Sequence, residues 1–400
     1  MAEPAAPSLE TASSLKGAAD AAAGRGDLKG ARALLEQAVR VDPSDVALWM
    51  SLAACCRGQG DHEQAGAAVE GALRVDPRSF TALLMKASLI ERQGHATLAA
   101  IAYGVALTQC PPDEALNPAA RGAVAHAREL HGRHTAALEA ALKAEIHRDP
   151  TRARPSNARR AEVFAERIVG KRRVYHQDPV QFHYPGLPEV EFHDREDFAW
   201  LAELEAATGD IRAELIEILR EDGEDLQPYV NYPEGVPLDQ WAELNRSQRW
   251  GAFHLYYDGR EVAWNAKRAP KTMAAMARLP RPWVPGRSPA AMFSVLQPRT
   301  HIPPHTGIAN TRLVVHLPLI VPDGCGFRVG GETRTWREGE AWVFDDTIEH
   351  EAWNDSDQPR TILICDVWNP RLDEEERETI TALMSAMDRF NGSGPAGGEL

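Results

Sequence analysis

A step of 34 residues, repeated three times in the first third of the chain, constrains the fold more than any other feature of the sequence. Glycines, prolines and two sets of alanines keep this step: Gly26, Gly60, Gly94; Pro43, Pro77, Pro111; Ala31, Ala65, Ala99; Ala38, Ala72, Ala106. Small residues let paired helices approach closely, and a proline ends the second helix because it cannot continue the hydrogen-bond ladder. The pattern therefore predicts stacked helix–turn–helix units.

This pattern resembles the tetratricopeptide repeat. Arrays of this kind bury their core by stacking neighbours and present a concave face to a peptide or protein. The resemblance implies an α-helical solenoid over residues 14–147, with a groove that recruits a peptide or protein substrate or partner. A purely scaffolding solenoid is the alternative. A fourth, degenerate helical pair is expected over residues 117–147 as a cap.

Composition sets the remaining boundaries. We expect a disordered lead over residues 1–13 and a linker over 148–178, because RDPTRARPSNARR breaks the repeat with prolines and arginines. A β-rich domain is expected over 179–385, followed by a flexible tail over 386–400. The arginines of the linker are interpreted as a solvated helix face, with an acidic ligand or nucleic acid as the alternative.

Charge and cysteine usage exclude several classes of protein. A formal net charge of -14 argues against a non-specific binder of nucleic acid or of anionic membranes, both of which need a concentrated positive field. Five cysteines without paired spacing do not form a disulfide framework. The sequence contains no run of about 18 apolar residues, the length that predicts a membrane-spanning helix. We therefore expect a cytoplasmic protein with reduced thiols.

The second half of the chain has the pattern of an antiparallel β-protein. One amphipathic helix is expected in DFAWLAELEAATGDIRAELIEILRED, residues 197–222. Eight β-branched and aromatic segments follow, separated by Gly, Pro and Asp turns: WGAFHLYY, AMFSVLQP, TRLVVHLPLIV, GCGFRVGG, ETRTWRE, EAWVFDD, HEAWND and RTILICDVW. They predict a sandwich or jelly roll, that is, a cupin-like double-stranded β-helix. The whole chain is thus expected to be an α+β multidomain protein.

Two histidines stand beside predicted strand ends and are candidate metal ligands. In a double-stranded β-helix, His305 and His350 can meet at one pocket mouth. Non-heme Fe(II) oxygenases hold iron with two histidines and one carboxylate, and the carboxylate usually comes two residues after the first histidine. Here that residue is Gly307, so water or another group would complete the site. Arg360, at the start of the next strand, could hold the distal carboxylate of a dicarboxylate.

The segment from FSVLQPRTHIPPHTG to DVWNP resembles the aspartyl/asparaginyl β-hydroxylase family of Fe(II)- and 2-oxoglutarate-dependent dioxygenases. The likeness covers about residues 180–375, and its specific motifs are HTG, FDD-x-x-EHEAWN and DVWNP. It implies iron held by His305 and His350. It also implies 2-oxoglutarate held by Ser294 and Arg360 at the distal carboxylate and by His316 at the other, with ascorbate as supporting reductant.

The resemblance implies hydroxylation of an aspartyl, asparaginyl or similar side chain, and one position departs from it. The animal enzymes carry an arginine where this chain has Val314, so Arg312 is the available substitute for a contact with 2-oxoglutarate or substrate. Halogenation, a small-molecule or lipid substrate, and a non-catalytic binding module remain alternatives.

Each candidate residue also has a structural alternative. His316 could be a core histidine, and Arg360 could pair with Asp355 or Asp357. Asp345 and Asp346 are expected to form a turn or to orient His350 through a hydrogen bond, with direct ligation as the alternative.

Overall fold

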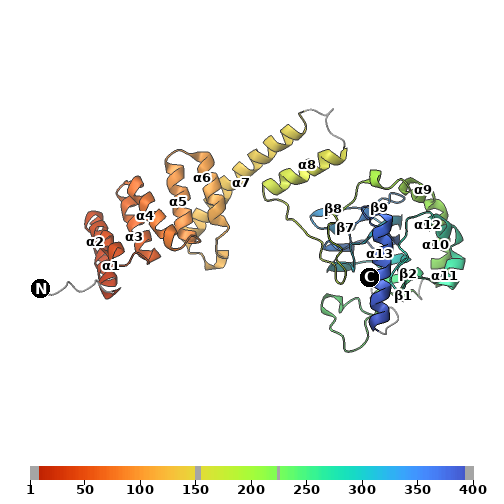
Figure 1. Cartoon of the computed structure of the whole chain (residues 1–400). Helices are drawn as coiled ribbons and strands as arrows, with labels where there is room; N and C mark the ends of the chain where they lie inside the picture. The colour runs from red at the N-terminus through yellow and green to blue at the C-terminus, as the bar shows by residue number, and fades with distance from the viewer. Residues whose placement is uncertain (1–8, 149–154, 223–225, 392–400) are drawn as a thin grey trace. The chain divides into compact units, whose positions relative to one another are not determined.

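The computed structural model describes residues 9–148, 155–222 and 226–391, and the chain divides into two compact units, Met1–Val169 and Gly170–Leu400 (Figure 1). The first unit is helical and the second contains all the described strands, so the predicted order of a helical region followed by a β-rich domain is confirmed. None of the helices within the described ranges is both long and apolar enough to cross a membrane.

Three antiparallel helix pairs confirm the repeat. They are α1 (Leu9–Gly24) with α2 (Leu28–Val41), α3 (Val46–Gly58) with α4 (His62–Val75), and α5 (Phe80–Arg92) with α6 (Ala96–Leu107). Each phased glycine has a positive φ in the turn between the two helices of its pair: Gly26, Gly60, Gly94. All six phased alanines have no exposed surface. The glycines are therefore required by the backbone of the turn, and the alanines by close helix packing.

The cap differs from the prediction. Instead of a helical pair over 117–147 there is one long helix, α7 (Pro118–Ile146), which follows a short 3-10 turn, η1 (Asp113–Ala115). The chain stays helical through Gly132 and Arg133, so no turn divides this range into two helices. The prediction of a pair is wrong.

Helices also occupy parts of the predicted lead, linker and tail. α1 begins at Leu9, and α8 (Pro155–Ile168) packs against α7 inside the range 148–178. α13 (Glu374–Asn391) extends past residue 386. Residues 169–178 of the predicted linker form no helix, while residues 1–8, 149–154 and 392–400 of these segments lie outside the described residues.

Two antiparallel sheets form the second unit, and all eight predicted strand segments contain a strand. The large sheet has the order β1-β2-β4-β11-β6-β9, with β3 beside β2: β1 (Gln227–Pro228), β2 (Trp250–Tyr257), β3 (Arg260–Glu261), β4 (Ala291–Leu296), β6 (Arg312–Ile320), β9 (Trp342–Phe344), β11 (Arg360–Trp368). The small sheet has the order β5-β10-β7-β8: β5 (Thr300–His305), β7 (Cys325–Val329), β8 (Glu332–Arg334), β10 (His350–Asn354). The β-rich antiparallel fold is thus confirmed, and its assignment as a double-stranded β-helix stays a prediction.

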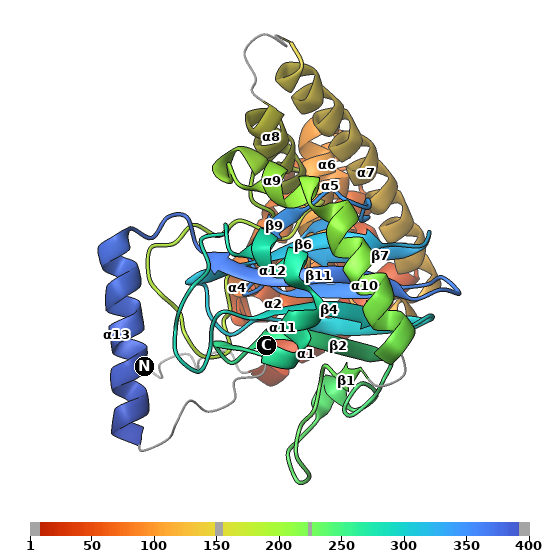
Figure 2. The same cartoon turned by 90° about the vertical axis from the view of Figure 1, so that its right-hand side faces the viewer.

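Helices cover the face of the large sheet that points away from the small sheet. The predicted single helix is two helices, α9 (Leu201–Ala206) and α10 (Thr208–Asp222), because the hydroxyl of Thr208 donates to the carbonyl of Glu205 at the junction. Figure 2 shows α10 lying across the strands of the large sheet. The unit is completed by η2 (Arg195–Asp197), η3 (Asp239–Trp241), α11 (Ala263–Arg268) and α12 (Pro270–Met276).

The large sheet is therefore buried on both faces. One hydrophobic cluster joins its strands to α9, α10 and α12, and a second joins its other face to β5, β7 and β10 of the small sheet. Burial on both sides explains why β4, β6 and β11 are buried along almost their whole length and are mostly apolar, instead of alternating with exposed polar residues. The few polar side chains that point between the two sheets are thus candidates for function.

Candidate active site

Strand alternation directs the candidate residues into one cavity between the sheets. On β6, Leu313, Val315 and Leu317 belong to the cluster under the helices, so His316 points to the opposite face. The same alternation places Ser294 of β4 and Arg360 of β11 on that face. All three line one cavity together with His305, Gly307 and His350. The structure thus brings together five of the six predicted site residues.

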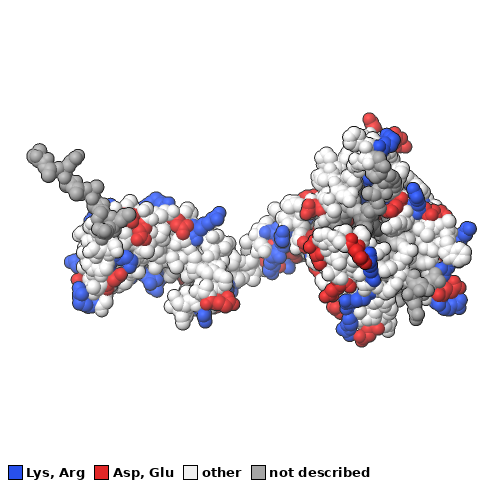
Figure 3. All heavy atoms as spheres, turned by 90° about the horizontal axis from the view of Figure 1, so that it is seen from below, with Lys and Arg blue, Asp and Glu red and all other residues white. Residues whose placement is uncertain are grey.

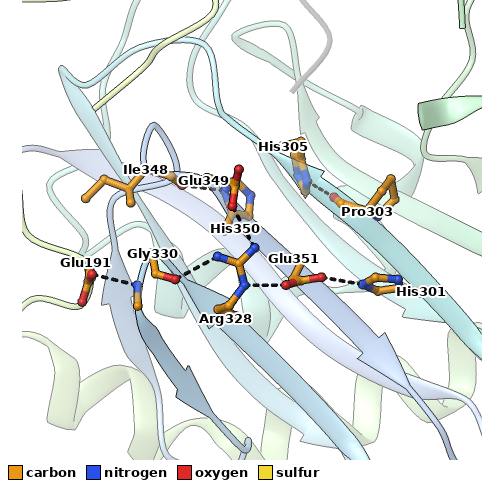
Figure 4. Close-up of polar contacts among 11 residues, drawn as sticks. Glu191, His301, Pro303, His305, Arg328, Gly330, Ile348, Glu349, His350 and Glu351 are labelled. Carbon is orange, nitrogen blue, oxygen red and sulfur yellow. Dashed lines mark hydrogen bonds and ion pairs between the residues drawn. The ribbon is translucent and has the colours of Figure 1, made fainter. Parts of the chain in front are cut away.

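The two candidate ligands lie opposite each other on neighbouring strands. His305 ends β5 and His350 begins β10, where they are register partners, and their ring centroids are 4.0 Å apart (Figure 4). The Nδ1 atom of His305 donates to the carbonyl of Pro303 at 2.8 Å, and that of His350 to the carbonyl of Ile348 at 3.1 Å. These bonds leave the lone pair of each Nε2 atom available to a metal ion.

Burial keeps both rings in the form that can bind a metal. Removal from water lowers the pKa of His305 to about 3 and that of His350 to about 4. The pKa of about 3 for His305 includes a smaller lowering by the neighbouring ring of His350. Two neutral imidazoles this close together are candidates to hold a divalent metal through two nitrogens. Within the described residues, no cluster of three or more His, Cys, Asp or Glu side chains has metal-binding geometry.

Gly307 leaves space that a neighbouring carboxylate fills. A Cβ atom at Gly307 would overlap Asp346 Oδ2, while the backbone of the two residues is joined by a hydrogen bond from Gly307 N to Asp346 O at 2.7 Å. Asp346 also lines the cavity. The absent side chain at 307 is therefore replaced in space by a carboxylate from another segment of the chain.

Arg360 is a buried cation with unused donors. It is 1% exposed, its Nε and Nη1 atoms have no hydrogen-bond partner, and its guanidinium lies over the ring of Trp336 at 4.8 Å. Burial lowers its pKa to about 10. The alternative of a salt bridge to Asp355 or Asp357 is wrong, since Asp357 pairs with Arg299. A buried guanidinium that faces a cavity with free N–H groups is suited to an anionic ligand.

Ser294 and His316 lie beside this cation on the same cavity wall. Ser294 is fully buried and accepts a hydrogen bond from Trp250 Nε1 at 3.1 Å, which leaves its own hydroxyl proton free to point into the cavity. His316 has an unpartnered Nδ1 atom, and burial together with the charge of Arg360 lowers its pKa well below 6.5. His316 is in the core, as its structural alternative requires, and it lines the cavity as well.

Arg312 does not line this cavity with the other five residues. Its Nη2 atom lies 3.2 Å from Asp346 Oδ2, and both side chains are buried. The position of Val314 does line the cavity, so an apolar wall stands where the animal enzymes have a cation. That Arg312 substitutes for this cation stays a prediction, and in this structure its guanidinium is paired with Asp346.

Asp345 and Asp346 have separate partners. Asp345 accepts from the backbone and hydroxyl of Thr347 at 3.0 and 2.6 Å and from Gln177, which makes it a turn residue as predicted. Neither aspartate side chain forms a hydrogen bond with His350, whose ring is oriented by the carbonyl of Ile348. The ring also forms a hydrogen bond with the backbone of Asp346, so the expected hydrogen bond to His350 involves the main chain of that residue instead of its carboxylate.

Sequence reasoning missed the aromatic wall next to His305. Trp241 packs edge-on against the His305 ring at 5.0 Å, and Tyr229 stacks on Trp250 at 3.7 Å. Trp241 lies in a short 3-10 turn and Tyr229 directly after a two-residue strand. Segments this short carry no periodic signal that could have revealed these two residues.

A polar network braces the ligand strands on the outer face of the small sheet (Figure 4). Arg328 of β7 pairs with Glu349 and Glu351, the two residues that flank His350. Glu351 in turn pairs with His301 of β5 at 2.8 Å. The network thus ties the strand of His350 to the strand of His305 on the side opposite the cavity.

Elsewhere on the surface, acidic and basic side chains are interspersed on the face of each unit shown in Figure 3. Both signs occur together over the helical unit and over the β-rich unit in that view.

Two protein families match the chain. The family described as Aspartyl/Asparaginyl beta-hydroxylase matches residues 205–370, and that described as Tetratricopeptide repeat matches residues 22–89. Among solved structures, the Arabidopsis OM64 TPR domain matches 30% of this chain and 97% of its own length at 20% identity, with a TM-score of 0.27.

Curated relatives of the β-rich unit are named as hydroxylases. The mouse aspartyl/asparaginyl beta-hydroxylase is 39% identical over 150 residues, which is 37% of this chain and 20% of that protein. The ornithine lipid ester-linked acyl 2-hydroxylase of Rhizobium tropici is 35% identical over 196 residues, 48% of this chain and 66% of that protein. The chain thus spans only a fifth of the length of the animal enzyme. These matches show that its β-rich unit belongs to the aspartyl/asparaginyl β-hydroxylase family and follows a helical unit of tetratricopeptide repeats.

Proposed function

We propose that the β-rich unit is an Fe(II)- and 2-oxoglutarate-dependent dioxygenase that hydroxylates an aspartyl, asparaginyl or similar side chain of a peptide or protein. The observation that carries this proposal is the arrangement of His305 and His350, with free Nε2 atoms, around the cavity where Arg360 offers unpaired N–H groups. Iron with 2-oxoglutarate supplies the oxidising power for inserting oxygen into a carbon–hydrogen bond.

The residues present fit both groups. The two neutral imidazoles would hold the metal, and Arg360 with the hydroxyl of Ser294 would hold the distal carboxylate of 2-oxoglutarate. His316, neutral beside Arg360, would contribute a hydrogen bond to the other carboxylate through a ring nitrogen. The apolar residues around them, including Val314, Phe327 and Phe344, exclude water and so strengthen each of these contacts.

The substrate proposal rests on the domain order and on the relatives. Tetratricopeptide repeats bind peptides along a concave face in general, so we infer that the helical unit recruits a peptide or protein substrate or partner. The relative from Rhizobium tropici is named as a lipid acyl hydroxylase, which makes a lipid the second candidate substrate. A cytoplasmic location stays a prediction.

The test is succinate formation from 2-oxoglutarate by the full chain with Fe(II) and ascorbate, compared between the wild type and His305→Ala and Arg360→Ala. A matched control is His254→Ala, because His254 is also a buried histidine but does not line the cavity. We expect loss of turnover in the first two variants and retention in the third. Product mass measured with and without chloride separates hydroxylation from halogenation. Absence of both turnover and anaerobic Fe(II) binding in the wild type would contradict the proposal.

A further inference from the structure

Residues 177–182, a short segment that we call the strap, run across the two loops next to the candidate metal ligands. One loop follows His305 at the end of β5, and the other precedes His350 at the start of β10. Backbone N–H groups of the strap donate to the carbonyl of Thr347 at 2.8 Å and to that of Gly307 at 2.9 Å. The strap is thus hydrogen-bonded to both loops.

The side chain of Gln177 joins the two loops to each other. Its amide nitrogen Nε2 donates to Asp345 Oδ2 at 2.5 Å, and its amide oxygen Oε1 accepts from Asn310 Nδ2 at 3.0 Å. Asp345 stands five residues before His350, and Asn310 stands five residues after His305. One amide therefore connects the segments that carry the two imidazoles.

Both partners of this amide are buried, so they depend on it for hydrogen bonding. Asp345 and Asn310 have no exposed surface. Oδ1 of Asp345 accepts from Thr347, while Oδ2 accepts from the amide of Gln177. The amide nitrogen of Asn310 donates to the carbonyl of Tyr184 at 2.9 Å as well as to Gln177. Loss of the amide would take a partner from a buried carboxylate oxygen and from a buried N–H, which is unfavourable.

From these contacts we propose that Gln177 is a positioning residue for the metal site: its amide fixes the two loops so that His305 and His350 face one metal ion. The inference rests on the proposed function, because it needs a metal at these histidines. The loops also meet through the hydrogen bond from Gly307 N to Asp346 O. A single bond lets the loops turn relative to each other, whereas a second attachment through Gln177 fixes their orientation as well. Removing such an outer partner changes metal affinity about 10- to 100-fold.

An exchange of the amide and the carboxylate between positions 177 and 345 tests this role. Gln177→Glu places a second carboxylate against that of Asp345, and the repulsion of two like charges separates the loops. Adding Asp345→Asn restores an amide–carboxylate pair in the opposite direction. The carboxylate at 177 can then accept from the new amide and from Asn310, while the amide oxygen at 345 can still accept from Thr347. The double variant has the net charge of the wild type.

The measurement is the affinity of the full chain for Co(II), together with the absorbance spectrum of the bound ion. Gln181→Glu is the matched control, because it makes the same substitution at an exposed side chain of the same strap. Thermal unfolding without metal establishes that each variant is folded. We expect Gln177→Glu to bind Co(II) about tenfold more weakly and with an altered spectrum. Added negative charge alone would have the opposite effect and strengthen the binding of a cation. The double variant should bind nearly as tightly as the wild type, and Gln181→Glu should match the wild type.

The positioning role is overturned, while the proposed metal site stands, if the wild type binds Co(II) and Gln177→Glu keeps both its affinity and its spectrum. It is also overturned if the double variant binds as weakly as Gln177→Glu. If the wild type binds no Co(II), the proposed function fails and this inference fails with it. If Gln177→Glu does not fold, Gln177→Met replaces it, because methionine removes the amide without adding charge, and the same loss of affinity is expected.

Discussion

Replacing Arg360 by methionine should make the ligand-free protein more stable while removing its affinity for 2-oxoglutarate. The buried guanidinium has two donor nitrogens without partners, and burial lowers its pKa from its ordinary value to about 10. That difference corresponds to a cost of about 3 kcal/mol for keeping the charge inside the protein. The contact with the Trp336 ring returns about 1–2 kcal/mol. Methionine has similar length and no charge, so the expected net gain in the free energy of unfolding is about 1–2 kcal/mol.

Differential scanning calorimetry of the full chain, without added iron or 2-oxoglutarate, measures this gain. For a unit of the size of Gly170–Leu400, it corresponds to a rise of about 2–8 °C in the melting temperature of the β-rich unit. Arg299→Met is the control, because Arg299 is exposed and should shift the transition little. At 100 times its Kd, 2-oxoglutarate should stabilise the wild type by about 2.7 kcal/mol and leave Arg360→Met unchanged. A loss of stability of more than about 1 kcal/mol in Arg360→Met would refute the reasoning, since it would show that the cation is structural.

Three further predictions follow from other contacts. Gly307→Ala should lower the free energy of unfolding by about 1–3 kcal/mol, because the added Cβ overlaps Asp346. In urea unfolding, Asp346→Gly should lower the free energy of unfolding less in the Gly307→Ala background than in the wild type. Arg328→Met should weaken the affinity for Co(II), measured by absorbance, about tenfold, and Arg328→Lys should restore part of it. Unchanged affinity would show that the ion pairs of Arg328 with Glu349 and Glu351 are not needed to position His350. His254 has a pKa lowered by burial to about 4, so the unfolded state takes up its proton first as the pH falls from about 6.5, and stability is lost down to about pH 4. Between about pH 6.5 and pH 4, the free energy of unfolding of His254→Leu, measured by urea unfolding, should therefore fall by up to about 3 kcal/mol less than that of the wild type. A variant with the same pH profile as the wild type would contradict this prediction.

Periodicity allowed the repeats and the strands to be predicted, but not the partners of charged residues. His316 lies on the cavity face, opposite to Leu313 and Val315, as alternation along a strand requires, and this alternation is a local property of the sequence. The pairing of Arg312 with Asp346 joins residues of two different segments through a side-chain contact, and no local pattern encodes it. The same holds for Gln177, whose amide joins Asp345 to Asn310 across two loops.

The Pro-Pro-His-Thr-Gly corner has a physical explanation in the small sheet. β5 is an edge strand of that sheet, so one of its sides has no neighbouring strand. On that side, the missing N–H groups of Pro303 and Pro304 cost the sheet no hydrogen bond and discourage pairing with another chain. On the other side, the register with β10 shifts between His350 and Ala352, and the prolines occupy this bulge. The bulge lets the carbonyl of Pro303 turn toward the His305 ring and accept its Nδ1 proton. The prolines thus fix both the direction of the strand end and the tautomer of the histidine, which is what a ligand at that position requires.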